Sequence, residues 1–394
     1  MPAVDRLVFR ANPRYELVPV DRLTDRERGL LGDLIDDDLY GVLRPAKDSR
    51  LEPRSCSPDT ALLFFTLGEP GALPAFARRN LGAEADRILA RLVVDGVLEV
   101  ATDEGFRSGS AAAGLVFPSP SGAGQGRIAE LSTAALRYGQ ALVALPTEVL
   151  AGRLYFYGQR PVSPALRRRL PDVWAVDEYA GIAPDGPVGR TLAAAGWTER
   201  QPGAGGGRAS WRFWAPRSSR REAGPPGQAD ALYKLYVSPT LDAMPETGAA
   251  VAGSLATSPG VRGFKVARDV VGLCRTDKIV VYFDRLDDLR HGASQVVEEL
   301  AGTPAQGVPF VAAITLDGLV SWGADPPSNR AAPTSWRAWV VERLAEYLQA
   351  AGQGGDAGEV EPWRFALERL RLAGVDTDTW VPARGIWRDA EDMS

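Results

Sequence analysis

Lysine is rare in this chain, and its positions mark where side-chain chemistry could occur. Only four of the 45 basic residues are lysines. Lys47 stands alone, whereas Lys234, Lys265 and Lys278 fall within one stretch of the C-terminal half. Lysine is a compact point charge whose pKa drops on burial, so it can act as a base where arginine cannot. These three lysines are candidates for a reactive site, with scatter or packing as the alternative.

The stretch from 261 to 278 is basic within an acidic protein, whose net charge is −5. Phosphate is the anion that such a cluster is best suited to bind, because arginine binds phosphate through two N–H groups and lysine binds it as a point charge. The alternative is that sheet-edge lysines and loop arginines deter aggregation and do no chemistry. The cations are Arg262, Lys265, Arg268, Arg275 and Lys278, and the acids are Asp269 and Asp277.

The elements that would position these residues lie between 232 and 316. The pattern predicts strands at 232–237, 261–268, 278–283 and 309–316, and helices at 239–256 and 286–300. This β-α-β-β-α-β order is the split βαβ, or ferredoxin-like, arrangement. It packs both helices on one face of a four-stranded antiparallel sheet and leaves the other face open or covered by another domain.

Strand parity assigns side chains to the two faces of that sheet. Tyr233, Leu235 and Val237 should face the helices, so Lys234 and Tyr236 should lie on the opposite face. The first and third strands are central neighbours in this arrangement, which places Lys278 beside the strand of Lys234. The second strand adds Lys265.

The whole chain is expected to be α+β, with three parts. Residues 1–110 form a winged-helix-like module, with helices at 58–67 and 83–94 and a hairpin at 97–108. Residues 127–201 form a mixed α/β middle segment with a strand at 153–157, and 231–394 hold the βαββαβ unit and a helical tail. Linkers rich in Gly, Ser, Ala and Pro are expected at 108–126 and 202–230, and the second of these contains one predicted strand at 210–214.

Composition excludes several classes. No apolar run is long enough for a membrane span, and no secretory signal is recognisable at the N-terminus. The two cysteines, Cys56 and Cys274, offer neither a disulfide framework nor a zinc spacing, so a cytoplasmic protein without metal or cofactor is expected. Arg87 and Arg91 on the helix at 83–94 are balanced by Glu84 and Asp86, which favours peptide binding or a structural role over DNA.

Three segments carry a resemblance to a known family. They are YKLYV at 233–237, FKV at 264–266 and RTDKIVVY at 275–282. They resemble the HopA-type effector-like proteins, which accompany kinase-like partners in bacterial peptide natural-product clusters such as class V lanthipeptide pathways. The segment 57–109 is similar to the small winged-helix peptide-recognition domains of such pathways. The resemblance covers about 90 residues of the C-terminal half and roughly 50 near the N-terminus.

The resemblance implies a lyase that eliminates phosphate from phosphoserine or phosphothreonine of a peptide, giving a dehydroamino acid. Such chemistry needs a base for the Cα proton, cations for the developing charge and a donor for the leaving oxygen. In phosphothreonine lyases of the effector type, a Lys-x-His pair supplies cation and acid, and this sequence has tyrosine in place of the histidine. The implied catalytic residues are Lys234, Lys265 and Tyr236, and the implied phosphate-binding residues are Arg268, Arg275 and Lys278.

Two other classes stay open. One is a non-catalytic scaffold that uses the winged module and the sheet as docking surfaces for a peptide or partner protein within a multi-component bacterial system. The other is an acidic DNA-binding regulator, which the charge balance disfavours. A lyase would release phosphate from a phosphopeptide, whereas a scaffold or a DNA-binding regulator would not. This release therefore separates the lyase from the other two classes.

Overall fold

The computed structural model describes residues 7–31, 39–47, 49, 51, 53–117, 124–200, 210–217, 233–326, 335–352 and 360–383. Helices and sheets are both extensive, which confirms the predicted α+β class. The chain forms two compact units. One unit joins Gly122–Glu346 to Gly374–Ser394, and the division into three domains stays a prediction. The other unit joins Met1–Ser121 to Tyr347–Ala373.

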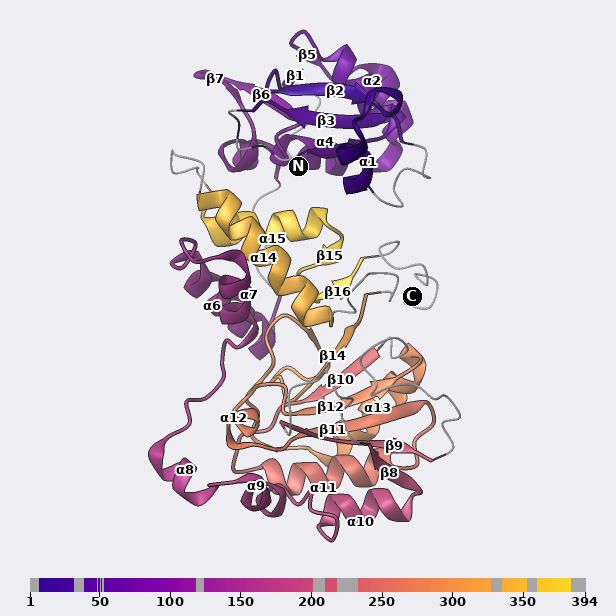
Figure 1. Cartoon of the computed structure of the whole chain (residues 1–394), viewed down its shortest axis with the longest axis vertical. Helices are drawn as coiled ribbons and strands as arrows, with labels where there is room; N and C mark the ends of the chain where they lie inside the picture. The colour runs from indigo at the N-terminus through magenta and orange to yellow at the C-terminus, as the bar shows by residue number, and fades with distance from the viewer. Residues whose placement is uncertain are drawn as a thin grey trace. The chain divides into compact units, whose positions relative to one another are not determined.

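The N-terminal unit contains two small antiparallel sheets (Figure 1). One has the strand order β5-β1-β6-β7 and the other β2-β3-β4. Its strands are β1 (Val8–Ala11), β2 (Tyr15–Pro19), β3 (Gly41–Pro45), β4 (Arg54–Cys56), β5 (Gly71–Ala72), β6 (Leu98–Thr102) and β7 (Gly105–Arg107). Its helices are α1 (Asp25–Leu31), α2 (Pro58–Thr66), α3 (Ala75–Leu81), α4 (Ala85–Val94), α5 (Ala113–Val116) and α15 (Pro362–Leu372).

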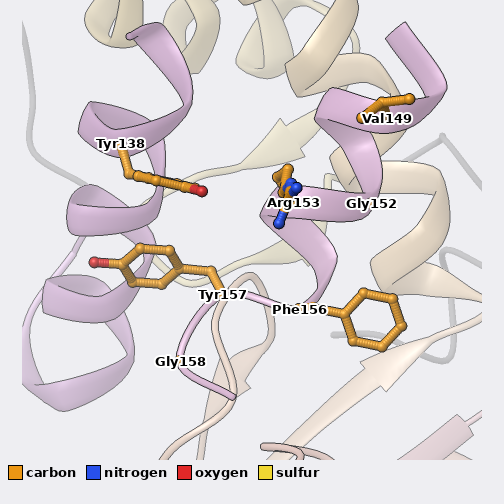
Figure 2. Close-up of a pocket in the computed structure, with 7 residues that line it drawn as sticks. All are labelled: Tyr138, Val149, Gly152, Arg153, Phe156, Tyr157 and Gly158. Atoms are coloured by element: carbon orange, nitrogen blue, oxygen red, sulfur yellow. The ribbon is translucent and has the colours of Figure 1, made fainter. Parts of the chain in front are cut away.

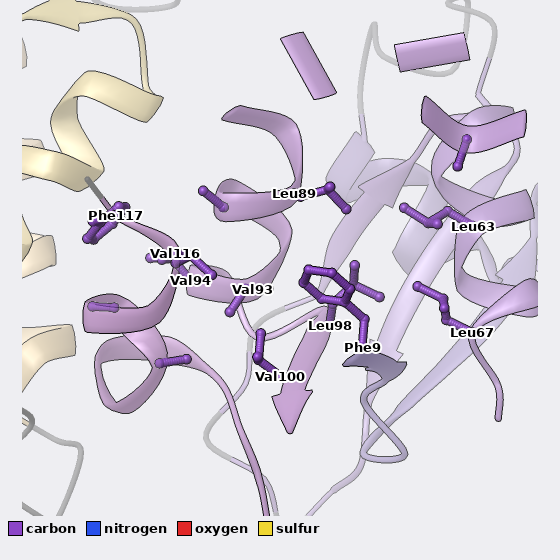
Figure 3. Packing of buried hydrophobic residues seen from close by; sticks show 14 of the residues in the cluster. Phe9, Leu63, Leu67, Leu89, Val93, Val94, Leu98, Val100, Val116 and Phe117 are labelled. Carbon is purple, nitrogen blue, oxygen red and sulfur yellow. The ribbon is translucent and has the colours of Figure 1, made fainter. Parts of the chain in front are cut away.

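Three apolar clusters hold this unit together, and one of them joins strands β1 and β6 to helices α2 and α4. Figure 3 shows Phe9 of β1 packed among Leu63 of α2, Leu89 of α4 and Leu98 of β6. Helix α2 begins where Ser57 accepts a hydrogen bond from the Thr60 amide and proline occupies the first turn, the usual signals of a helix start. Burial of these side chains, at about 1.5–3 kcal/mol each, supplies most of the stability of the unit.

Several helices and strands predicted for this unit are confirmed. The predicted helices at 58–67 and 83–94 correspond to α2 and α4, and the predicted hairpin to β6 and β7. The linker predicted at 108–126 is wrong for its first part, because Ala112, Ala113 and Val116 are buried in the core. Residues 118–123 lie outside the described part of the chain. The winged-helix arrangement stays a prediction.

The second unit is built on a seven-stranded antiparallel sheet with the order β13-β14-β10-β12-β11-β9-β8 (Figure 1). The strands are β8 (Trp197–Arg200), β9 (Trp211–Pro216), β10 (Tyr233–Val237), β11 (Val261–Ala267), β12 (Ile279–Phe283), β13 (Ala312–Ala313) and β14 (Val320–Ala324). The helices are α6 (Gly126–Gln140), α7 (Thr147–Tyr155), α8 (Pro164–Arg169), α9 (Val173–Tyr179), α10 (Pro187–Ala194), α11 (Met244–Leu255), α12 (Val270–Leu273), α13 (Leu286–Glu299) and α14 (Trp336–Gly352, which enters the first unit at Tyr347). A two-stranded ribbon follows, β15 (Val375–Asp376) and β16 (Val381–Pro382).

Both faces of the central strands are covered. Helices α11 and α13 pack against one face, as the strand parity predicts. The opposite face is not open: Trp336 of α14 lies against Gly323 of β14, and Arg337 and Tyr155 reach the turn that precedes β12. All five residues of β10 are therefore buried, and so are all five of β12.

Three sequence predictions for this unit need correction. The final strand predicted at 309–316 is reduced to the two residues of β13, which pair with β14, and the strand beside β10 is β14, within a stretch rich in turn residues. The strand predicted at 153–157 is instead the end of helix α7. The sheet has seven strands rather than four. One of the added strands, β9, corresponds to the strand predicted at 210–214 within the 202–230 stretch, and it pairs with β11. The ferredoxin-like name for the β10–β14 region stays a prediction. Among the described residues, no helix is long and apolar enough to cross a membrane.

Candidate functional site

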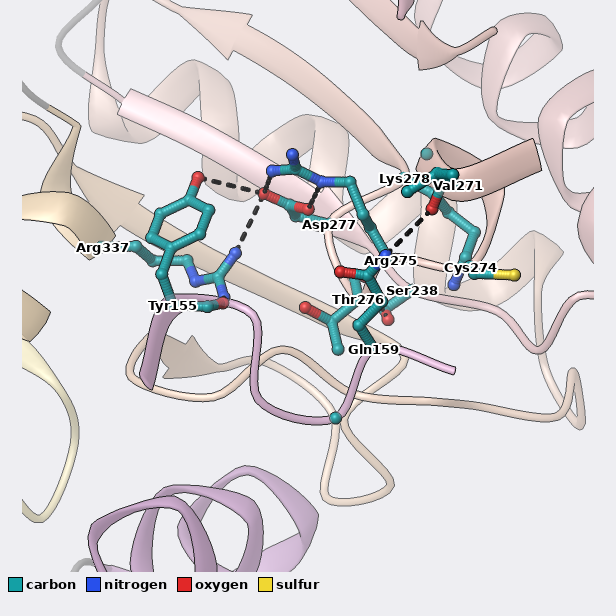
Figure 4. A network of polar contacts seen from close by, with 12 residues as sticks. Tyr155, Gln159, Ser238, Val271, Cys274, Arg275, Thr276, Asp277, Lys278 and Arg337 are labelled. Atoms are coloured by element: carbon teal, nitrogen blue, oxygen red, sulfur yellow. Dashed lines mark hydrogen bonds and ion pairs between the residues drawn. The ribbon is translucent and has the colours of Figure 1, made fainter. Parts of the chain in front are cut away.

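A buried carboxylate organises the polar face of the sheet. Arg275 donates two hydrogen bonds to Asp277, Nε to Oδ1 and one terminal nitrogen to Oδ2, both at 2.8 Å (Figure 4). Arg337 donates to the same Oδ2 at 2.9 Å, and the Tyr155 hydroxyl lies 3.2 Å from it. Burial by itself raises the pKa of Asp277, but Arg337 and Arg275 outweigh it and hold that pKa well below its usual range. Asp277 is therefore an anion fixed between two guanidinium groups.

A second ion pair lies on the same face. The Lys234 ammonium of β10 contacts the Asp325 carboxylate, which also accepts a hydrogen bond from the Trp336 amide at 2.9 Å. Burial raises the pKa of Asp325, and Lys234 opposes that rise. The side chains of Lys234 and Asp325 are 8% and 12% exposed, so neither charge is hydrated as it would be at a surface.

Lys265 differs from the other cations of this face. Within the described residues its ammonium has no carboxylate partner, and it lies 3.9 Å from the centre of the Trp211 ring. The residue is half-buried. Burial is the main cause that lowers the pKa of Lys265 to about 8, with Lys234 and Arg275 acting in the same direction and Asp277 opposing them. About a tenth of Lys265 is therefore neutral amine at pH 7, far more than for an exposed lysine.

Two tyrosines share this face with the lysines. Tyr236 pairs across the ladder with Val280, which pairs in turn with Lys265, so the two side chains stand two strands apart on one side of the sheet. Tyr282 pairs with Lys234, whose ammonium lies 5.5 Å from the Tyr282 ring centre. Burial raises the pKa of both tyrosines well above the usual range. Both hydroxyls therefore stay protonated and can act as hydrogen-bond donors.

The structure brings four of the six predicted site residues together. Lys234, Lys265, Tyr236 and Arg275 lie on the same face, and with Arg337 they form what we call the cation cluster. Arg268 lies elsewhere, because it follows β11 on the other face and pairs with Asp177 at 3.1 Å. The Lys278 ammonium donates to the Pro239 carbonyl at 2.8 Å and to Gln306 Oε1 at 2.6 Å, and it is fully buried. Arg268 and Lys278 thus lie outside the cluster, and each is already bound to other groups of the protein.

Sequence reasoning missed Arg337 and Trp211 and the role of Asp277 as the centre of the cluster. A signal for Arg337 existed: it interrupts an apolar helical stretch next to Trp336, and a charged residue there needs a buried partner. Trp211 carried no comparable signal, because the strand pairing that brings it to Lys265 is long-range. Among the described residues, no group of three or more His, Cys, Asp or Glu side chains is placed to hold a metal ion.

The chain matches no protein-family model, and no curated protein matches it. Among solved structures it is similar to an effector protein from Pseudomonas syringae pv. tomato strain DC3000, with 12% identity, a TM-score of 0.39, and coverage of 64% of this chain and 97% of that one. A second similar structure is an effector protein from Pseudomonas syringae pv. syringae strain 61, with 12% identity, a TM-score of 0.36, and coverage of 64% and 100%. A third is the phosphothreonine lyase SpvC, an effector protein from Salmonella, with 14% identity, a TM-score of 0.25, and coverage of 49% and 90%.

Proposed function

We propose that the cation cluster is the active site of a lyase that eliminates phosphate from phosphoserine or phosphothreonine of a peptide. The observation that carries this proposal is the position of Lys265, a lysine without a carboxylate partner beside cations that have one. A structural ion-pair network would pair this lysine too. A base that removes a proton from carbon has to stay unpaired, because an ion pair would hold it in the protonated form.

The charge balance of the cluster suits a phosphate monoester. Four cations, Lys234, Lys265, Arg275 and Arg337, face two carboxylates, Asp277 and Asp325. When Lys265 is protonated, two positive charges remain uncompensated. A phosphorylated side chain carries a charge of about −1.5 to −2 at neutral pH. The proposed phosphate ligand is Arg275, whose side chain is 19% exposed, whereas Arg337 and Lys234 are enclosed and hold Asp277 and Asp325. The predicted Arg268 and Lys278 lie outside the cluster.

The proposed reaction is a β-elimination. The neutral amine of Lys265 takes the Cα proton, and the electron pair of that C–H bond forms the Cα=Cβ double bond. The Cβ–O bond to phosphate breaks, and phosphate leaves with the electron pair of that bond. Tyr236, which keeps its proton, donates it to the leaving oxygen. The products are a dehydroamino acid and hydrogen phosphate, with Lys265 left as an ammonium and Tyr236 as a phenolate. Transfer of a proton from the Lys265 ammonium to the Tyr236 phenolate restores both groups for the next turnover.

Mass spectrometry tests this proposal directly. The full chain is incubated with peptides that contain phosphothreonine or phosphoserine, and the peptide should lose the mass of one phosphoric acid. Plain hydrolysis would give a different mass, since the product would retain a hydroxyl group. Lys265→Met should abolish the loss, whereas Lys47→Met, which changes the exposed lysine of the other unit, should leave it intact. Equal rates for wild type and Lys265→Met would refute the assignment of the base.

A second candidate is a non-catalytic peptide-binding protein. It is favoured by the completeness of the Arg275–Asp277–Arg337 and Lys234–Asp325 contacts, which satisfy most of the buried charges without any ligand. On this proposal the network is a polar core, and a peptide or a kinase-like partner docks elsewhere. Phosphopeptide that binds the full chain but keeps its phosphate after long incubation would favour this candidate over the lyase.

A further inference from the structure

A pocket beside the cation cluster is left unused by the proposed reaction. It has a volume of about 450 Å³ and lies where helix α6 faces the end of helix α7 (Figure 2). The volume is within the range of roughly 300–1,000 Å³ that is usual for ligand sites. Tyr138 of α6 and Tyr157, just after α7, form one side, with ring centres 5.6 Å apart. Val149 and Phe156 of the α7 region complete the apolar lining.

The lining is unusually exposed for such side chains. Phe156 is 48% exposed, and Tyr138 and Val149 are each 41% exposed. Large apolar side chains gathered in one concave place are typical of a binding site, whereas single exposed ones are ordinary. These three therefore offer apolar surface for a partner group to cover.

A single charge sits in this lining. Arg153 of α7 is exposed, and within the described part of the chain its guanidinium has no hydrogen bond or ion pair. In the view of Figure 2 it lies between the two tyrosines and Phe156. An aromatic lining with one unpaired guanidinium suits an apolar side chain that is followed or preceded by an acidic one.

The pocket is linked to the cluster through a series of ring contacts. The Arg275 guanidinium carbon lies 5.0 Å from the Phe156 ring centre and 5.2 Å from that of Trp211. The Lys265 ammonium lies 3.9 Å from the Trp211 ring centre. An extended peptide advances about 3.3 Å per residue, so about four residues cover this path. A peptide whose phosphorylated residue meets Lys265 can therefore place a nearby side chain in the pocket.

We propose that this pocket binds an aromatic side chain of the substrate peptide, located within about four residues of the phosphorylated one, and that Arg153 pairs with an acidic neighbour of that side chain. The inference rests on the proposed lyase function, which places the phosphorylated residue at Lys265. It deepens that function by naming the substrate class: phosphopeptides with an aromatic and acidic motif close to the phosphate.

Short peptides with a central phosphothreonine test this proposal. One phenylalanine is moved through positions up to about four residues from the phosphothreonine, on either side, with a glutamate next to it and alanine elsewhere. Affinity for the full chain is measured by fluorescence anisotropy, and elimination by mass spectrometry. At the preferred position, replacing phenylalanine by alanine should weaken binding roughly tenfold, as expected for a buried aromatic anchor. Phe156→Ala should have the same effect, and Trp174→Ala, which removes an exposed aromatic outside the pocket, should have none.

A charge swap tests the role of Arg153. Arg153→Glu should lower the affinity for the glutamate peptide roughly threefold, as for an exposed ion pair. The same variant should prefer a peptide with lysine in place of that glutamate. Because Arg153 is exposed and unpaired, its substitution should not disturb folding.

The two readouts separate this inference from the lyase proposal. Elimination that is indifferent to the aromatic residue and to Phe156→Ala would overturn the pocket and leave the lyase standing. Aromatic-dependent binding without elimination would overturn the lyase and support the pocket as a peptide site. If the Arg153→Glu variant binds the lysine peptide no more tightly than it binds the glutamate peptide, the assignment of Arg153 is overturned.

Discussion

The Lys265 ammonium lies 3.9 Å from the centre of the Trp211 ring, and the Arg275 guanidinium lies 5.2 Å from the centre of the same ring. One indole from β9 thus contacts both the unpaired lysine and a paired arginine of the cation cluster. A ring can attract a cation without taking its proton or neutralising its charge. Trp211 therefore holds the Lys265 ammonium in place without adding a charged partner.

The activity of the proposed lyase should rise with pH. The pKa of Lys265 is lowered to about 8, mainly by burial, so the fraction of neutral amine grows as the pH passes through that value. We expect kcat/KM for a phosphopeptide to increase between pH 7 and 9 and then level off, with a midpoint near 8. Initial rates over this range check the prediction, and a profile that falls over the same range would exclude Lys265 as the base.

Tyr236→Phe should slow elimination about 100-fold or more, the usual contribution of a general acid. The substitution removes one hydroxyl and keeps the ring that packs between β10 and its neighbours, so the fold should be preserved. Tyr282→Phe is the matched control, because Tyr282 lies on the same face and is equally buried. If Tyr282→Phe causes the larger loss, the proton donor is Tyr282 and the assignment of Tyr236 is wrong.

Asp277→Asn should destabilise the second unit by about 3–5 kcal/mol, the usual effect of breaking a buried ion pair. Arg337 is 1% exposed on its side chain and would be left without its anion. Urea unfolding followed by circular dichroism measures the change. Asp287→Asn, at a surface pair whose aspartate side chain is 75% exposed, should change the free energy of unfolding by less than about 0.5 kcal/mol. Similar values for the two variants would show that the network adds little stability.

Lys278→Met should alter how stability depends on pH. Burial lowers the pKa of Lys278 from 10.5 to about 7. Between these values the unfolded chain binds a proton that the folded chain does not, so the contribution of Lys278 to the free energy of unfolding grows as the pH rises from about 7 to 10.5. The stability of wild type relative to Lys278→Met should therefore increase over this window, as measured by urea unfolding at each pH. A constant difference would show that folding does not lower the pKa of Lys278.

Local patterns were sufficient to predict much of the fold. The strands and helices from Tyr233 to Glu299 are where alternation and helical spacing place them, because each buries a regular set of apolar side chains. The fourth strand was misplaced because PFVAAITL at 309–316 is apolar throughout and resembles a strand, whereas β14 is interrupted by Ser321 and Gly323. Only the pairing of Gly323 with Lys234 and the packing of Trp336 on that glycine explain β14, and both are long-range.

The site was predicted where it depends on strand parity and missed where it depends on tertiary contacts. Lys234, Tyr236 and Lys265 were placed on one face because side chains alternate along a strand. Arg268 was grouped with them by sequence proximity, but its partner Asp177 comes from helix α9, far away in the sequence. Arg337 lies 60 residues from Asp277, and no local pattern connects the two.

The burial of β10 on both faces has a consequence for variation in this protein. A strand with one solvated face tolerates substitution at every second position, and that periodicity appears in any survey of variants. In β10 all five residues are enclosed, hydrocarbon on one side and ion pairs on the other. A saturation survey should therefore find intolerance at every position from Tyr233 to Val237. The two faces of the strand should differ in which substitutions they reject. Positions 233, 235 and 237 should accept other apolar residues of similar volume, whereas position 234 should accept no uncharged residue.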